Sequence, residues 1–179
     1  MKYFSDAVDR LTGGLRQITT DHVYIHDGRF FTAESFPVIA TGGSYTFGFT
    51  APLVPKGIYI HYRPAIVVSS VDKLTISFYK GSVFTGGTPL TANNHNLNFA
   101  LTNKFVIVGA PTVTTQGALI QQTYIPGSTG VGGTRSGGLS SLENEWVLVP
   151  GAQYLGIFAN GSLDANKVAI NFQWYEEGA

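Results

Sequence analysis

The stretch KVAINFQWYE, residues 167–176, decides the fold class of this chain. Its apolar side chains recur at every second position: Val168, Ile170, Phe172 and Trp174. Asn171 and Gln173 lie between them and point the opposite way. A period of two indicates a β-strand with one buried face, because successive side chains of an extended backbone leave on opposite sides. The stretch therefore predicts a strand that lines a core.

The rest of the chain shows the same strand pattern. KLTISFYK (73–80) alternates in the same way, and turn residues such as TGG (41–43) and NG (160–161) separate the candidate strands. Further strands are predicted at 22–26, 36–40, 44–50, 57–69, 96–109, 118–125, 145–150 and 153–160. The segment 57–69 is expected to break at Pro64. Many short strands with turns between them indicate an all-β fold, whether a sandwich, a jelly roll or a barrel.

The pattern Val-x-Thr-x-Gly occurs twice, at 83–87 (VFTGG) and at 113–117 (VTTQG). It fits two similar strand-turn units, or the same turn chemistry used twice. We favour the second interpretation, because glycine is a common turn residue in any sequence.

Composition limits the classes of partner. Charged residues make up only 12% of the 179 residues, and 11 basic side chains balance 11 acidic ones. Nucleic acids and anionic lipids need a basic face, and no cluster of Lys and Arg provides one, so we expect neither as a partner. A polar but uncharged surface suits a protein packed against copies of itself, or one that binds sugars. The chain has no cysteine, which excludes disulfides and thiolate zinc sites.

The N-terminal segment is the best helix candidate. Between Tyr3 and Leu15, with Ser5 as a cap, the apolar residues form one stripe. The members of this stripe are Phe4, Val8, Leu11 and Leu15. Because so short a helix is marginal in water, we expect the stripe to dock on its own domain or on a neighbouring subunit. The expected organisation is an N-terminal arm (1–20), helical or extended, and a single β-domain (21–179).

Targeting patterns are missing from the sequence. MKYFSDAVDRL (1–11) has no apolar run of signal-peptide length, and no segment reaches the about 20 apolar residues of a membrane span. We therefore expect synthesis in a cytoplasm.

The longest interruption of the strand pattern is rich in glycine. Between Gly127 and Gly138, six of the twelve residues are glycine. A phosphate-binding loop would continue with a Lys and a helix, but Arg135 is the one basic residue here and SLENEWVLVP (141–150) leads into a strand. We expect a long surface connection that another subunit or a capsid orders, with Arg135 as its directed contact.

The four histidines do not predict a metal site. His22 and His26 would share one face of a helix, but in the strand expected here they lie about 13 Å apart. That distance is too large for one ion with bonds of about 2.0–2.1 Å. His61 lies within the predicted strand at 57–69, and His95 lies in the polar run ANNHNLN (92–98). Most of the four are expected to be exposed or singly hydrogen-bonded. We expect no metal and no cofactor.

No catalytic constellation is recognisable. A glycosidase needs two carboxyl groups facing a cleft, and no spacing selects a pair among the candidates Asp72, Glu143, Glu145 and Asp164. Glu143 and Glu145 fit a solvated strand edge, and no G-x-S-x-G elbow occurs. We predict a protein that is not an enzyme and has no catalytic residues.

Exposed aromatic rings would favour sugar binding. The tyrosines that fall in predicted strands are expected to lie mostly in the core: Tyr24, Tyr59, Tyr62, Tyr79, Tyr124 and Tyr154. In WYEE (174–177), Trp174 and Tyr175 point to opposite faces. One of these two rings is therefore expected to be partly exposed.

Several short motifs occur in a fixed order in the second half of the chain. They are FYKG (78–81), PTVTTQG (111–117), YIPG (124–127), the glycine-rich stretch, EWVLVP (145–150), YL (154–155) and WYE (174–176). In this order they resemble small structural proteins of tailed-bacteriophage heads, over about residues 78–176. The resemblance implies a capsid decoration, cement or head-fibre protein with an antiparallel β-sandwich of jelly-roll type, often trimeric. It implies no catalytic residues.

The expected function follows from this resemblance and from the absence of catalytic motifs. We expect a non-enzymatic virion structural protein that decorates or cements the outer capsid surface. As a homo-oligomer, expected to be a homotrimer, it would bind between major capsid subunits. The alternative is a receptor- or carbohydrate-binding module of a phage fibre, with ANNHNLN (92–98) as its binding loop. A hydrolase has no motif in its favour.

Overall fold

The computed structural model describes residues 20–53, 59–69, 73–99, 101–125, 135–138 and 145–178. The helix predicted between Tyr3 and Leu15 lies outside these residues. The elements are α1 (Thr20–His26), β1 (Phe30–Ser35), β2 (Val38–Ile39), β3 (Ser44–Thr50), β4 (Tyr59–Ser69), β5 (Leu74–Lys80), β6 (Val83–Thr85), β7 (Thr88–Pro89), β8 (Asn93–Asn94), β9 (Val106–Gly109), β10 (Thr112–Thr115), β11 (Ala118–Ile125), β12 (Arg135–Gly138), β13 (Trp146–Leu148), β14 (Gln153–Asn160) and β15 (Asn166–Glu177).

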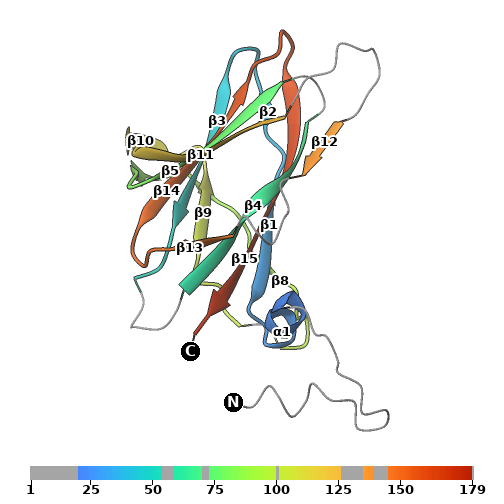
Figure 1. The fold of residues 1–179 in the computed structure, drawn as a ribbon, viewed down its shortest axis with the longest axis vertical. Helices are drawn as coiled ribbons and strands as arrows, with labels where there is room; N and C mark the ends of the chain where they lie inside the picture. The colour runs from blue at the N-terminus through green and yellow to red at the C-terminus, as the bar shows by residue number, and fades with distance from the viewer. Residues whose placement is uncertain are drawn as a thin grey trace.

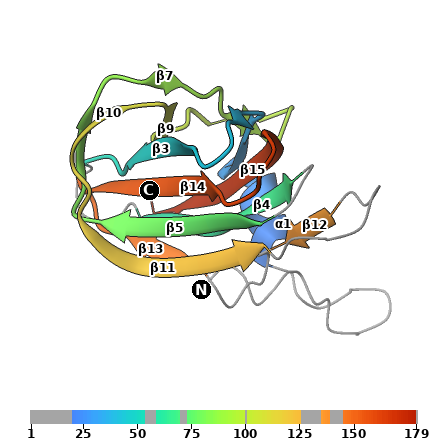
Figure 2. The same ribbon diagram turned by 90° about the horizontal axis from the view of Figure 1, so that it is seen from above.

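Two large antiparallel sheets pack together around a core (Figures 1 and 2). The first has the order β12-β4-β15-β1-β8, with β13 also pairing β4 and β2 also pairing β15. The second has the order β11-β5-β14-β3-β9-β7. The predicted all-β, antiparallel sandwich is confirmed.

Strand β15 confirms the alternation seen in residues 167–176. It pairs β1 on one side and β4 on the other, so that Trp174 lies opposite Phe31 and Tyr62. The side chains of its apolar face are at most 2% exposed: Val168, Ile170, Phe172 and Trp174. Because each large apolar side chain contributes about 1.5–3 kcal/mol on burial, this strand is a major source of the stability of the sandwich.

Aromatic rings join the two sheets. The ring of Phe49 on β3 lies 5.2 Å from that of Tyr62 on β4 and 5.6 Å from that of Phe172 on β15. Phe105, which precedes β9, lies 5.5 Å from Trp174 in an edge-to-face arrangement. Tilted and edge-to-face contacts suit the charge distribution of aromatic rings, so these contacts favour one packing of the sheets.

Strand β4 continues through Pro64, so the predicted break was wrong. Asn171 of β15 pairs with Ile66, whereas Gln173 pairs with Arg63. Two residues of β4, the first of them Pro64, therefore oppose one residue of β15 in a β-bulge. A bulge is one of the places where a strand tolerates a residue without an N–H group.

The strand predicted at 96–109 is confined to β9, and the residues before β9 form a loop. Side-chain amides of this loop hydrogen-bond to the nearby backbone. Oδ1 of Asn96 accepts the N–H of Phe99 at 2.9 Å, and Oδ1 of Asn103 accepts the N–H of Phe105 at 3.1 Å. Such local bonds compete with strand pairing, and here they replace it.

The two Val-x-Thr-x-Gly segments pair with each other. Strands β6 and β10 form a two-stranded antiparallel sheet in which Thr85 lies opposite Thr112. Gly87 and Gly117 both adopt positive φ, +92° and +84°, a conformation open to glycine at little cost. The segments are therefore similar strand-turn units that also share their turn chemistry.

Residues 22–26 belong to helix α1, so the strand predicted there was wrong. The helix ends in a Schellman motif, in which Gly28 N–H donates to Ile25 C=O at 3.0 Å and Arg29 N–H donates to Tyr24 C=O at 2.8 Å. These end bonds outweigh the strand preference of Val, Tyr and Ile. Among the described residues, no helix is long and apolar enough to cross a membrane.

Part of the glycine-rich stretch is a strand. Arg135–Gly138 form β12, which pairs with β4 between Ile66 and Ser69. The prediction of one long connection as far as Gly138 was therefore wrong for residues 135–138. Glycine is rare in strands, so this pairing could not be recognised from the sequence. Residues 126–134 lie outside the described residues, and the partner contact of Arg135 stays a prediction.

Candidate functional site

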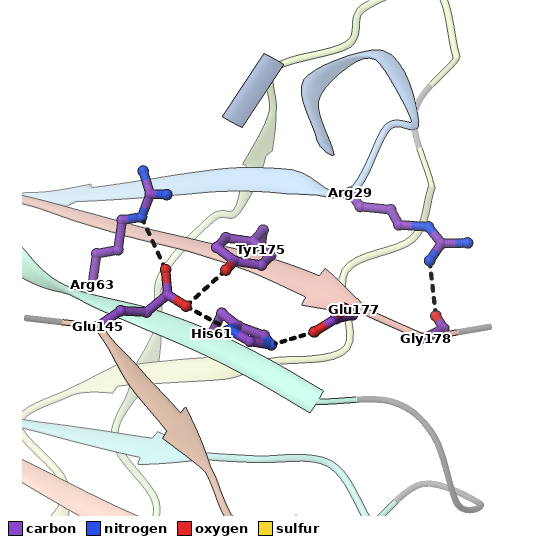
Figure 3. Close-up of polar contacts among 7 residues, drawn as sticks. All are labelled: Arg29, His61, Arg63, Glu145, Tyr175, Glu177 and Gly178. Atoms are coloured by element: carbon purple, nitrogen blue, oxygen red, sulfur yellow. Dashed lines mark hydrogen bonds and ion pairs between the residues drawn. The ribbon is translucent and has the colours of Figure 1, made fainter. Parts of the chain in front are cut away.

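A cluster of polar and aromatic side chains lies on the outer face of the first sheet (Figure 3). We call the following residues the outer cluster: Tyr24, His61, Arg63, Glu145, Tyr175 and Glu177. They come from α1, β4, the residue before β13, and β15. His61 and Arg63 alternate along β4 with Ile60 and Tyr62, which belong to the core. The outer cluster therefore lies on the face of β4 that points away from the core.

His61 lies between two carboxylates (Figure 3). Its Nδ1 is 2.6 Å from Oε1 of Glu145. Its Nε2 is 2.8 Å from Oε2 of Glu177, which is ion-pair distance without hydrogen-bond geometry. A carboxylate can only accept, so Nδ1 of His61 is the donor in the hydrogen bond to Glu145. His61 is 9% exposed and, among the described residues, is hydrogen-bonded through Nδ1 alone, which agrees with the expectation of a singly hydrogen-bonded ring.

Glu145 is the centre of the outer cluster. Besides His61, its Oε1 accepts the hydroxyl of Tyr175 at 2.7 Å, and its Oε2 lies 3.6 Å from Nε of Arg63. Its side chain is 20% exposed, so the predicted solvated strand edge was wrong here. The sequence did not reveal this, because the partners belong to distant strands.

The other nominated carboxylates are not part of this cluster. Asp164 is exposed in the turn between β14 and β15. Asp72 and Glu143 lie outside the described residues.

Stacked rings complete the outer cluster. The ring of Tyr175 lies 4.1 Å from that of Tyr24 and 4.4 Å from that of His61, and the Arg63 guanidinium lies 5.5 Å from its centre. Burial, followed by the charge of Glu177 and a hydrogen bond to it, raises the pKa of Tyr24 to about 12. Burial, followed by the bond to Glu145, raises the pKa of Tyr175 well above its usual value. Both hydroxyls therefore remain protonated donors at neutral pH.

The outer cluster has a geometry that suits the stabilisation of contacts between distant segments. Each nitrogen of His61 already faces a carboxylate, so neither points to an open position where a substrate could exchange a proton. The cluster joins α1, β4, β15 and the start of β13, which are far apart in the sequence. Nearby, the guanidinium of Arg29 donates to the carbonyl of Gly178 at 2.9 Å (Figure 3) and fastens the end of β15.

The loop nominated for sugar binding uses its amides internally. Nδ2 of Asn94 donates to the carbonyl of Gly28 at 2.7 Å, and Nδ2 of Asn96 donates to that of His26 at 2.8 Å. These bonds fasten the loop to the end of α1. An exposed group of the loop is instead apolar, since Leu97 is 92% exposed. The side-chain amides of Asn94 and Asn96 are thus engaged with the backbone.

The remaining histidines differ from the expectation in one respect. His95 is exposed and its Nε2 lies 3.2 Å from Oγ1 of Thr32, as expected for a single bond. His22 and His26 lie on α1, and their Nε2 atoms are 3.1 Å apart, so the strand separation of about 13 Å was wrong. In the described part of the chain, no three His, Asp or Glu side chains are grouped so as to hold a metal ion.

Both rings of the WYEE segment are buried. Trp174 is 1% exposed in the core, where its Nε1 donates to Oδ1 of Asn103, and Tyr175 is 5% exposed beneath the outer cluster. The expectation of one partly exposed ring was therefore wrong. Of the other tyrosines in strands, Tyr62 and Tyr154 lie in the core, whereas Tyr59 and Tyr124 are exposed.

Strand β11 presents a different kind of surface. Among the strands that the structure describes, it is the terminal strand of the second sheet, and its sequence ALIQQTYI (118–125) carries no charge. Leu119 and Tyr124 are 50% and 59% exposed. The Tyr124 hydroxyl donates to Gln122, whose amide donates to Ser77 of β5. We call Ala118–Ile125 the β11 edge.

Comparison with models of protein families, with curated proteins and with solved structures found no match for this chain.

Proposed function

We propose that the chain is a non-enzymatic virion structural protein that decorates or cements a phage capsid. It acts as a homo-oligomer that binds between major capsid subunits. The ordered motifs of residues 78–176 support this class of protein, and the charged share of only 12% supports burial against other protein surfaces. The β11 edge is the observation that carries the proposal.

The order of the strands supports a jelly roll. Eight of the described strands are, in chain order, β1, β3, β4, β5, β11, β12, β14 and β15. Numbered 1 to 8 in this chain order, the strands of one sheet lie side by side as 1-8-3-6, and those of the other sheet as 2-7-4-5. This is the order produced when two Greek keys wrap into a double sheet, an architecture shared by viral capsid and lectin domains.

The β11 edge favours association with further copies of the chain. A terminal strand offers unpaired N–H and C=O groups, and proteins that remain monomeric protect such strands with charges or cover them. The β11 edge has no charged residue, and Leu119 and Tyr124 add apolar area beside it. In a threefold ring, the β11 edge of each copy contacts a different surface of the next copy.

The molar mass in solution tests this proposal. Light scattering is expected to give a trimer of the 19.2 kDa chain, and Leu119→Lys is expected to release monomers, because a charge at the β11 edge opposes pairing. Leu163→Lys is the matched control, since Leu163 is 93% exposed in the turn after β14. A monomeric wild-type protein, or equal masses for both variants, contradicts the role of the β11 edge.

The receptor- or carbohydrate-binding module remains the alternative, because lectins also use jelly rolls. Its nominated loop, 92–98, gains no support from the internal bonds of Asn94 and Asn96. Saturable binding on a glycan array would favour this alternative over capsid decoration. Asn94→Ala is a poor test of it, because the substitution also removes a bond that holds the loop.

A further inference from the structure

We infer that His22 and His26 form a two-histidine binding site for a divalent transition-metal ion of the Ni²⁺, Cu²⁺ and Zn²⁺ group. Both residues lie on α1, four positions apart, and therefore on the same side of the helix. Their rings are edge to face with centroids 4.5 Å apart, and both are exposed. The site is separate from the outer cluster and from the β11 edge.

The distance between the two Nε2 atoms fits a shared ion. These atoms are 3.1 Å apart. An ion bound to both at the usual Zn–N distance of about 2.0–2.1 Å would see them at an angle of about 95–102°. That angle lies between those of square-planar and tetrahedral sites, which Cu²⁺ and Zn²⁺ prefer respectively. The separation of the two nitrogens therefore suits one shared ion.

The chemistry of the pair is also suitable. Without metal, an Nε2–H of one ring donates to the Nε2 lone pair of the other, so the two nitrogens already face each other. When each ring holds its proton on Nδ1, both Nε2 lone pairs are available and the ion takes the place of the bridging proton. Imidazole is a favoured ligand for Zn²⁺, Cu²⁺ and Ni²⁺.

The surroundings define the kind of site. No third His, Asp or Glu among the described residues completes a protein cage, so water fills the other positions and the ion exchanges readily. The ion would bridge two residues that lie one turn apart in a helix of only seven residues. Because binding to the folded state alone stabilises it, metal should strengthen α1, which also carries Tyr24 of the outer cluster.

Titration of the untagged full chain with CuCl₂ tests the inference. Calorimetry is expected to show one saturable Cu²⁺ site, and either His22→Ala or His26→Ala should weaken it about tenfold or more, because each removes one of two nitrogen ligands. The matched control His95→Ala removes an exposed imidazole whose Nε2 lies 3.2 Å from Oγ1 of Thr32, outside the pair, and should leave the affinity unchanged. Alanine is the best helix former, so α1 is expected to persist in both helix variants, as circular dichroism can verify.

A spacing variant and a spectrum separate chelation from general binding to histidine. Asp21→His combined with His22→Ala keeps the number of histidines but places them five residues apart, and it should bind as weakly as His22→Ala. Electron paramagnetic resonance of the Cu²⁺ complex should show two coordinating imidazole nitrogens in the wild type and one in His26→Ala. Equal affinity of the wild type and both alanine variants, or no saturable binding by the wild type, overturns the inference.

Discussion

At the scale of single residues, Glu145 and His61 show how a few polar side chains hold distant segments together. They are 84 positions apart, yet Nδ1 and Oε1 lie 2.6 Å from each other. The same carboxylate also serves Tyr175 and Arg63. A group with several partners in a mostly buried place costs more to remove than an exposed one, because its partners are left unsatisfied.

Glu145→Ala is therefore expected to lower the free energy of unfolding by about 1–3 kcal/mol. The hydroxyl of Tyr175 and the Nδ1 of His61 lose their acceptor, and Arg63 loses an ion pair. Urea denaturation followed by tryptophan fluorescence measures the change.

Glu34→Ala is the control for this substitution, because Glu34 is exposed on β1 of the same sheet. It should change the free energy of unfolding by no more than about 0.5 kcal/mol. An equal decrease in the free energy of unfolding for the two variants would show that the outer cluster does not stabilise the fold.

Glu176 gives a prediction about pH. It is 6% exposed, and burial raises its pKa above the ordinary 4.5, although the N–H of Lys104 donates to it at 2.8 Å and opposes the shift. A carboxyl whose pKa is raised in the folded state holds its proton longer there than in the unfolded chain. Ionisation of Glu176 therefore lowers the free energy of unfolding as pH rises from the pKa of this carboxyl in the unfolded chain to its pKa in the folded protein.

The variant Glu176→Gln lacks this titration. As pH falls from neutral to below 4.5, the stability of the wild type relative to Glu176→Gln is expected to rise. Urea denaturation of both proteins across this range measures the difference, in which the titration of all other groups cancels. A difference that is independent of pH, or that changes in the opposite sense, contradicts a raised pKa.

At the scale of elements, helix α1 depends on one glycine. Gly28 has a φ of +66°, in the left-handed region that closes a Schellman motif. A Cβ atom at this position would collide with the carbonyl oxygen of Phe99. Both the end of the helix and the close approach of the Asn-rich loop therefore require glycine.

Gly28→Ala is expected to lower the free energy of unfolding by more than the about 1–2 kcal/mol cost of a left-handed alanine. Gly42→Ala is the matched control, since Gly42 has a φ of +63° and no atom within 4 Å of the added Cβ. The excess loss at Gly28, measured by urea denaturation, is the cost of the collision. Equal losses at the two positions would mean that the loop moves away freely.

At the scale of the whole molecule, the sandwich combines a well-filled core with a surface poor in charge. Large apolar side chains remain exposed on several elements, among them Leu97, Leu119 and Tyr124. Charge repulsion contributes little to the solubility of such a surface, so its exposed apolar side chains favour burial in an assembly. The proposed capsid decoration depends on this property.

Removal of residues 1–19 tests the hypothesis that the N-terminal arm (1–20) makes the contacts with the capsid. Because α1 begins at Thr20, this deletion retains the helix and the outer cluster, so thermal unfolding should stay close to that of the full chain. Binding to capsids that lack the protein, measured by co-sedimentation, is expected to be lost. The double variant Val8→Gln/Leu11→Gln keeps the length of the segment and should lose binding too. Full occupancy by the truncated protein contradicts the arm.

Much of the fold could be predicted because its signal is local. The strands predicted at 44–50, 73–80, 118–125, 153–160 and 167–176 match β3, β5, β11, β14 and β15 to within one residue. The predictions failed where a tertiary contact outweighed local preference. The αL turn at Gly28 ended a helix where Val, Tyr and Ile suited a strand, and Asn96 and Asn103 replaced strand pairing with local bonds.

The sequence by itself determined that this chain is all-β, because side-chain periodicity is a property of neighbouring residues and can be recognised along the chain. Only the tertiary structure decided what lies together across strands. The pairing of β4 with β15 places His61 opposite Tyr175, and the entry to β13 brings Glu145 to both. Helix α1 brings the imidazoles of His22 and His26 into contact. Register and long-range pairing depend on the packing of the whole core, and no local pattern encodes them.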